Sequence, residues 1–258
     1  MVTENVPFTR FFRSLLELAV LGRMLRLAFE NGKLFRLPLI RKPKAAPARE
    51  GFFEQAQFQA VRRHLPADLQ LAVTIAYTYG WRMQSEVLTL QRRQIDLEAG
   101  SLRLDPGATK NEDARVVYLT PEVKALLAAQ LDRVDTLQKR VGRIIPYLFP
   151  HMPRGKRVGK RVGQQRDDFR KAWRAACKAA GVAGRLRHDF RRTAVRNMVN
   201  AGIPERVAMT ITGHKTRSVF DRYHIVSPAE LQAAALRLDS YNHGDNRLVP
   251  VDGALVTR

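Results

Sequence analysis

The pattern of apolar and polar positions divides the chain into segments with different expected structures. Between residues 11 and 30, apolar side chains recur at helical spacing, which predicts a helix or a broken helical pair, and Asn31-Gly32 is expected to end it. Residues 37–47 contain three prolines and three cations, a composition typical of an extended linker. We therefore expect a domain boundary at residue 47.

Beyond the linker, most of the patterning is helical. Leu69 to Tyr79 is nearly all apolar, which predicts a helix buried on all sides, and Gly80 can end it. The period changes between residues 94 and 119, where three short strands are expected, and Thr120-Pro121-Glu122 then predicts a helix start. The expected strands are Ile95 to Leu97, Ser101 to Leu104 and Ala114 to Leu119.

A last helix is expected near the end of the chain. Ser227-Pro228-Ala229-Glu230 has the pattern of a capping box with proline at the first helical position. The helix that follows carries an apolar stripe, formed by Leu231, Ala234, Ala235 and Leu238. Residues 241–258 are expected to form a C-terminal tail.

The charge balance narrows the choice of partners. The 258 residues include 45 Lys and Arg against 24 Asp and Glu, for a formal net charge of +21. This excess attracts polyanions, of which nucleic acid is the commonest in cells, although a ribosome-associated or membrane-surface protein would also be basic. Basic residues are densest between 152 and 192, where we expect phosphate contacts. The candidate DNA-binding residues are Arg154, Lys156, Arg157, Lys160, Arg161, Arg192 and Lys215.

Cysteine content and hydropathy bound the cellular setting. Cys177 is the single cysteine, so neither an intrachain disulfide nor a thiolate metal cluster can form, as suits a reducing cytosol. No apolar run approaches the roughly 18 residues needed to span a bilayer. The N-terminus lacks the basic-then-apolar order of a signal peptide. We expect a cytoplasmic protein with no membrane association, metal or cofactor.

Four short stretches could together perform phosphodiester exchange. This chemistry needs a nucleophile, cations for the non-bridging oxygens and an acid for the leaving oxygen. Each stretch alone has a commoner structural explanation, such as a surface ion pair, a helix cap or a packing tyrosine. Their order and spacing together favour chemistry. In chain order they are Gly80-Trp81-Arg82 with Glu86, His188-Asp189-Phe190-Arg191, Gly213-His214, and Tyr223 nine residues after that histidine.

This combination resembles the Arg, His-x-x-Arg, Gly-His and Tyr boxes of the tyrosine recombinases, the phage integrase family. The resemblance covers residues from about 50 to about 240 and implies a catalytic domain at residues 48–240. The implied fold is α+β, mostly α, with a small three-stranded antiparallel sheet. The implied activity is site-specific recombination or integration of double-stranded DNA. Strands would be cleaved and rejoined through a covalent 3′-phosphotyrosine, without metal or ATP.

The resemblance also implies roles by position. Tyr223 would be the nucleophile, the two arginines would hold the phosphate oxygens, and Lys110 in the turn between the second and third strands would be the general acid. The two histidines would act in hydrogen bonding and proton transfer. The implied catalytic residues are Arg82, Lys110, His188, Arg191, His214 and Tyr223, supported by Glu86.

Two departures from the family pattern stand out. Trp81 replaces what is often a smaller aliphatic residue. Only 47 residues, the linker included, precede the expected catalytic domain, where the family carries a helical core-binding domain, and residues 25–32 resemble the last helix of that domain. Residues 1–47 are therefore expected to be a remnant of it, as in a truncated integrase. The family's exchanged terminal helix implies a homo-oligomer on DNA, and accessory DNA-bending proteins are further expected partners.

Two other functions stay open from the sequence. A type IB topoisomerase-like enzyme would use a similar tyrosine and set of cations. A non-catalytic regulator would use residues 190–211 as a helix-turn-helix and would need neither Arg82, Lys110 nor Tyr223. A covalent protein–DNA adduct separates the regulator from the two enzymes.

Overall fold

The computed structural model describes residues 8–40, 51–107, 114–153, 155, 159–220 and 228–243. The chain forms two compact units, residues 1–50 and 51–258. In the first unit, α1 (Phe8–Glu30) ends where Asn31-Gly32 was expected to end it, and the Asn31 side-chain amide donates to the carbonyl of Leu27 at 2.7 Å. Most of the predicted linker lies outside the described residues, so the boundary at residue 47 stays a prediction.

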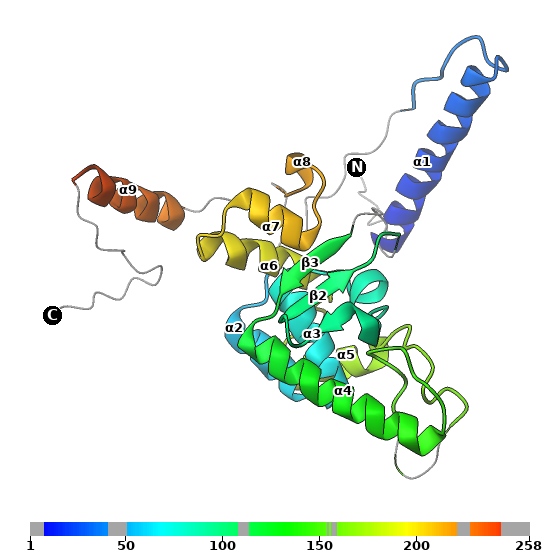
Figure 1. Ribbon diagram of the computed structural model, residues 1–258. Helices are drawn as coiled ribbons and strands as arrows, with labels where there is room; N and C mark the ends of the chain where they lie inside the picture. Colours follow the sequence, from blue (N-terminus) through cyan, green and yellow to red (C-terminus); the bar gives the residue numbers. More distant parts are fainter. Residues whose placement is uncertain are drawn as a thin grey trace. The chain divides into compact units, whose positions relative to one another are not determined.

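The second unit is mostly helical, as expected (Figure 1). No helix among the residues described is both long and apolar enough to cross a membrane. The helical elements are α2 (Gln55–Arg63), α3 (Ala67–Tyr79), the π-helix η1 (Met83–Val87), the 3-10 helix η2 (Arg92–Gln94), α4 (Pro121–Val141), α5 (Arg170–Ala179), α6 (Asp189–Asn200), α7 (Glu205–Thr212), α8 (Arg217–Phe220) and α9 (Pro228–Asn242).

The three expected strands form one antiparallel sheet in the order β1-β2-β3. The strands are β1 (Ile95–Asp96), β2 (Ser101–Leu104) and β3 (Arg115–Tyr118). Side chains alternate between the two faces, so Val117 is buried while Val116 and Tyr118 are exposed. Arg115 is in phase with Val117 and pairs with Leu104, which places its guanidinium on the buried face of the sheet.

Helix α3 lies at the centre of the unit. It packs against α4 on one side and α6 on another, which explains why most of its side chains are buried, in line with the apolar run in the sequence. Gly80 ends it with φ +69°, and a Cβ there would lie 3.0 Å from the Thr212 side chain. The glycine therefore allows both the left-handed turn and the close approach of α7.

A cluster of aromatic rings fixes the start of α6. Phe190 is fully buried, with its ring centroid 4.8 Å from that of Phe53 and 5.3 Å from that of Trp173. The opposite end of α6 packs against α7 through a smaller apolar cluster that includes Ala194, Val195, Met198 and Ala208. The residues flanking Phe190 are thus held on rigid support.

Candidate active site

Arg82 emerges where α3 ends and η1 begins. Its guanidinium Nη1 donates to Glu86 Oε1 at 2.7 Å, and its backbone N–H donates to Glu86 Oε2 at 2.7 Å. The pair is not the ordinary surface ion pair that its spacing usually indicates, since the Glu86 side chain is 0% exposed while that of Arg82 is 30% exposed. The buried Glu86 thus orients Arg82 and leaves part of the Arg82 guanidinium open to solvent.

Arg115 is a site residue that the sequence reasoning missed. Its Nη2 donates to Glu86 Oε1 at 2.6 Å, and its Nη1 donates to the carbonyl of Thr212 at 3.0 Å. Burial alone would raise the pKa of Glu86, but the hydrogen bonds from Arg82 and Arg115 and their positive charges hold it below its ordinary value. Arg115 lies two residues before Val117 and therefore shares the apolar face of its strand. This two-residue spacing was the signal in the sequence that could have indicated a buried arginine.

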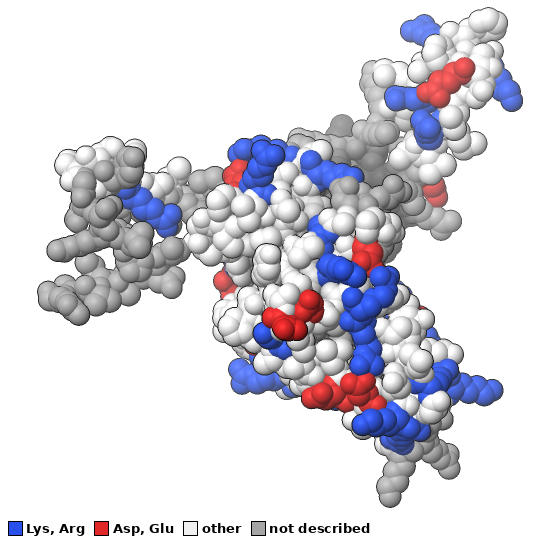
Figure 2. Space-filling model, viewed as in Figure 1, with Lys and Arg blue, Asp and Glu red and all other residues white. Residues whose placement is uncertain are grey.

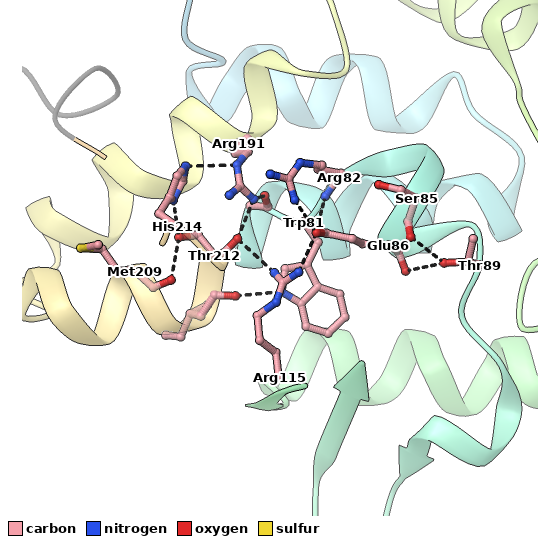
Figure 3. A network of polar contacts seen from close by, with 12 residues as sticks. Trp81, Arg82, Ser85, Glu86, Thr89, Arg115, Arg191, Met209, Thr212 and His214 are labelled. Carbon is pink, nitrogen blue, oxygen red and sulfur yellow. Dashed lines mark hydrogen bonds and ion pairs between the residues drawn. The ribbon is translucent and has the colours of Figure 1, made fainter. Parts of the chain in front are cut away.

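Arg191 joins the three helices around the site (Figure 3). It is buried, and its Nη1 donates to the carbonyls of Gly80 at 2.8 Å and Thr212 at 2.6 Å. Its Nε donates to His214 Nε2 at 3.2 Å. Nearby, Trp81 is buried and its indole N–H donates to the carbonyl of Ile211 at 2.9 Å, so this departure from the family pattern ties α7 to the end of α3.

His214 is neutral in this arrangement. A guanidinium can only donate, so His214 Nε2 accepts from Arg191 and the ring proton belongs on Nδ1, which lies 2.7 Å from Thr212 Oγ1. Burial, and then the positive charges of Arg191, Arg82 and Arg115, lower the pKa of His214 to about 3. Of the two roles expected for His214, hydrogen bonding fits this geometry, whereas proton transfer would require one of these bonds to break.

The neutral state of His214 predicts a pH dependence of stability. Its folded pKa of about 3 lies below the ordinary value of 6.5, so the unfolded chain takes up a proton first as the pH falls. The contribution of neutral His214 to the free energy of unfolding is complete above pH 6.5 and is lost progressively as the pH falls toward 3. His214→Gln, which keeps a donor and an acceptor, should therefore lose less stability than the unaltered chain between about pH 7 and about pH 5, measured by urea unfolding.

His243 supplies the control for this measurement, because it is exposed on the last turn after α9. His243→Gln should keep the full pH dependence of the unaltered chain. An equal loss of stability in the His214 variant and the unaltered chain would contradict the assignment of a neutral, protected His214.

A pocket of about 340 Å³ brings three of the expected catalytic residues together. Arg82, His188 and Arg191 all line it. His188, just before α6, reaches solvent, but the surrounding protein removes part of its hydration and Arg191 adds a nearby positive charge, so its pKa lies below its ordinary value. Two guanidinium groups and a neutral imidazole therefore border one cavity.

The remaining expected site residues differ in their exposure to solvent, and some of them lie outside the described residues. Lys215 is exposed and lines a second pocket, of about 290 Å³, together with His214. Lys160 and Arg161 are also exposed, and Arg192 is half-buried. On the face seen in Figure 2, Lys and Arg side chains form several groups with Asp and Glu between them. Five predicted site residues lie outside the described residues: Lys110, Arg154, Lys156, Arg157 and Tyr223.

A metal centre has no support in the described ranges. Within them, no group of three or more His, Cys, Asp or Glu side chains is placed to hold an ion. Cys177 is buried in α5, and burial raises the pKa of its thiol to about 11, which makes it a small apolar side chain.

Comparisons with known proteins place this arrangement in a family. The fold is similar to that of XerA recombinase, with 21% sequence identity, a TM-score of 0.55, and coverage of 91% of this chain and 82% of that one. It is also similar to the Tn1549 transposon integrase in complex with a circular intermediate DNA, with 14% identity, a TM-score of 0.66, and coverage of 91% and 81%.

A third similar structure is a lambda integrase dimer bound to a COC′ core site, with 16% identity, a TM-score of 0.59, and coverage of 83% of this chain and 59% of that one. A search of curated protein sequences gives no match. These structures confirm the expected fold class, a mostly helical tyrosine recombinase domain with a small antiparallel sheet. The model of the phage integrase family matches residues 54–230, and the chain belongs to that family.

Proposed function

We propose that this protein is a site-specific recombinase that cleaves and rejoins double-stranded DNA through a covalent 3′-phosphotyrosine on Tyr223. The observation that carries the proposal is the charge of the site. The guanidinium groups of Arg82, Arg115 and Arg191 lie in one hydrogen-bonded network, in which the buried carboxylate of Glu86 accepts from Arg82 and Arg115. The positive charge left over suits a phosphodiester anion in the pocket that Arg82 and Arg191 line.

The proposed reaction transfers the phosphorus from one oxygen to another. The Tyr223 oxygen attacks the scissile phosphorus, its proton passes to a neutral base, and the bond to the 5′ oxygen breaks. His188 suits the base because its lowered pKa keeps it neutral near pH 7. Lys110 would protonate the leaving 5′ oxygen, and the two arginines would hold the non-bridging oxygens as charge develops. Rejoining reverses these steps with the 5′ hydroxyl of another strand.

The anchoring of α8 supports the assignment of Tyr223. Phe220, the last residue of α8, is fully buried, and its ring centroid lies 5.7 Å from that of His214. Tyr223 follows three residues later, and three residues span at most about 11 Å. That length of chain is compatible with the proposed action of Tyr223 at this site.

We also propose the contacts that surround the reaction. The exposed Lys160, Arg161 and Lys215 and the half-buried Arg192 would bind the DNA backbone, as would the basic residues of the 154–157 segment. The stripe on α9 is exposed, including Leu231 and Leu238, and would dock on a second protomer. The solved Tn1549 and lambda integrases are bound to DNA, and the latter is a dimer.

Covalent trapping tests the proposal. The protein should be incubated, with a chelator present, with nicked duplexes taken from the DNA that flanks its coding sequence. A nick close to the cleavage point lets the short 5′-hydroxyl fragment diffuse away, so the adduct accumulates and shows on a denaturing gel. Absence of adduct on every substrate would favour the non-catalytic regulator. Adduct on nicked duplexes together with relaxation of a supercoiled plasmid, but no strand exchange between two sites, would favour the topoisomerase-like enzyme.

A further inference from the structure

We propose that Arg115 is a positioning residue that aligns both phosphate-binding arginines at once. The inference rests on the proposed function and adds a residue to its machinery. Arg115 is 6% exposed and lies on β3, whereas Arg82 and Arg191 belong to the end of α3 and to α6. It lines the second pocket, with His214 and Lys215, and not the pocket shared by Arg82, His188 and Arg191, so it would act on a phosphate held there through other groups.

Arg115 shares one acceptor atom with each of the two arginines (Figure 3). Glu86 Oε1 accepts from Arg82 Nη1 at 2.7 Å and from Arg115 Nη2 at 2.6 Å. The Thr212 carbonyl accepts from Arg191 Nη1 at 2.6 Å and from Arg115 Nη1 at 3.0 Å. The Arg115 guanidinium therefore bonds both to the carboxylate that holds Arg82 and to the carbonyl that holds Arg191.

Gly213 and Trp81 both lie close to this guanidinium. A Cβ on Gly213 would lie 2.5 Å from Arg115 Cζ, so the guanidinium occupies space that only glycine leaves open. Arg115 Cζ lies 5.8 Å from the centroid of the Trp81 ring, within the range of a cation–π contact. Because the planar fork is held in this way, its two donors point at Glu86 and Thr212 together, which a lysine ammonium cannot reproduce.

Because Arg115 and Arg82 share the Glu86 carboxylate, Arg115 also affects how much positive charge Arg82 presents to the substrate. Glu86 is fully buried, and a single guanidinium paired with it would be largely neutralised. Arg115 takes up part of the carboxylate's charge, which leaves Arg82 more positive toward the pocket. Without Arg115, Glu86 would hold Arg82 more tightly, and Thr212 would lose one of the two donors that fix its carbonyl beside Arg191.

The test compares cleavage by variants on two substrates. Arg115→Gln should slow single-turnover cleavage of a nicked suicide duplex by about 10- to 100-fold, the scale expected when supporting residues shift a reacting group by about 1 Å. The second substrate carries a methylphosphonate at the scissile position, which removes one anionic oxygen and with it part of the need for the arginines. On that substrate the loss should be clearly smaller.

A double-mutant cycle tests whether Arg115 acts through Glu86. If Arg115 acts through Glu86, the double variant Arg115→Gln, Glu86→Gln should lose little more than the worse single variant. Arg103→Gln is the matched control, because Arg103 lies on the neighbouring strand with its side chain 57% exposed, and it should cleave both substrates normally. Should Arg115→Gln fail to fold, Arg115→Lys keeps the buried charge and should show the same pattern with a smaller loss.

The outcomes separate the two proposals. No adduct with the unaltered chain would overturn the proposed function, and this inference with it. Adduct with the unaltered chain but equal losses on phosphate and methylphosphonate would show that Arg115 serves only the fold. Additive losses in the double variant would overturn the route through Glu86. Normal cleavage by folded Arg115→Gln would overturn the inference and leave the proposed function intact.

Discussion

Tyr223→Phe should abolish the covalent adduct and leave the affinity for DNA nearly unchanged. The variant lacks the oxygen that would attack phosphorus, while the cations that attract the backbone stay in place. Adduct is measured on a denaturing gel with a nicked suicide duplex, and binding is measured by fluorescence anisotropy at one fixed salt concentration. The expected result is complete loss of the first signal with little change in the second.

Tyr118→Phe is the matched control for this experiment. Tyr118 lies on β3 with 78% of its surface exposed, so removing its hydroxyl should leave adduct formation normal. Adduct that persisted with Tyr223→Phe would remove Tyr223 from the mechanism. Loss of adduct in both variants would point to damage that is unrelated to the nucleophile.

Replacing either pocket arginine should slow cleavage strongly, but the two replacements should differ in how much they lower the stability of the fold. Arg82→Ala and Arg191→Ala should each lower the single-turnover cleavage rate by about 10²–10³-fold, because a preorganised donor to the developing charge is lost. The corresponding Lys variants should recover only part of the rate, since an ammonium lacks the planar fork of the guanidinium.

The expected difference in stability follows from the burial of the two side chains. Arg191 is 3% exposed and bonds to Gly80, Thr212 and His214. Its removal takes away the donor that it supplies to the Gly80 carbonyl and to His214 Nε2, at a cost of about 1–3 kcal/mol for each group left unsatisfied, while the Thr212 carbonyl keeps the bond from Arg115. Arg82 is more open, and after its loss Glu86 keeps the hydrogen bonds from Arg115 and from the backbone at residue 82. Urea unfolding should therefore show a clear loss for Arg191→Ala and a smaller one for Arg82→Ala.

Two results would contradict this account. Near-normal cleavage by folded Arg191→Ala would tell against its contact with the phosphate. Equal losses of stability in the two variants would tell against the buried network as the support of Arg191. Arg103→Ala serves as the control, because its exposed side chain should contribute little to either measurement.

Local sequence determined much of the framework. The apolar run from Leu69 to Tyr79, the turn at Gly80 and the cap at Thr120 all depend on neighbours a few residues away. The observed boundaries of these helices and of the three strands agree with the expected ones to within two residues. The alternation in β3 likewise follows from a period of two. The order and spacing of the four boxes were enough to predict the family and the fold.

Only the tertiary structure decided how the site residues depend on one another. Arg191 bonds to Gly80 across 111 positions and Arg115 to Glu86 across 29, and no local pattern specifies such pairs. The sequence indicated a histidine near the phosphate, but the neutral state of His214 comes from burial and from three cations brought together by separate elements. Hydrogen bonding and desolvation depend on which distant groups meet, and for this protein the packing of α3, β3, α6 and α7 makes that choice.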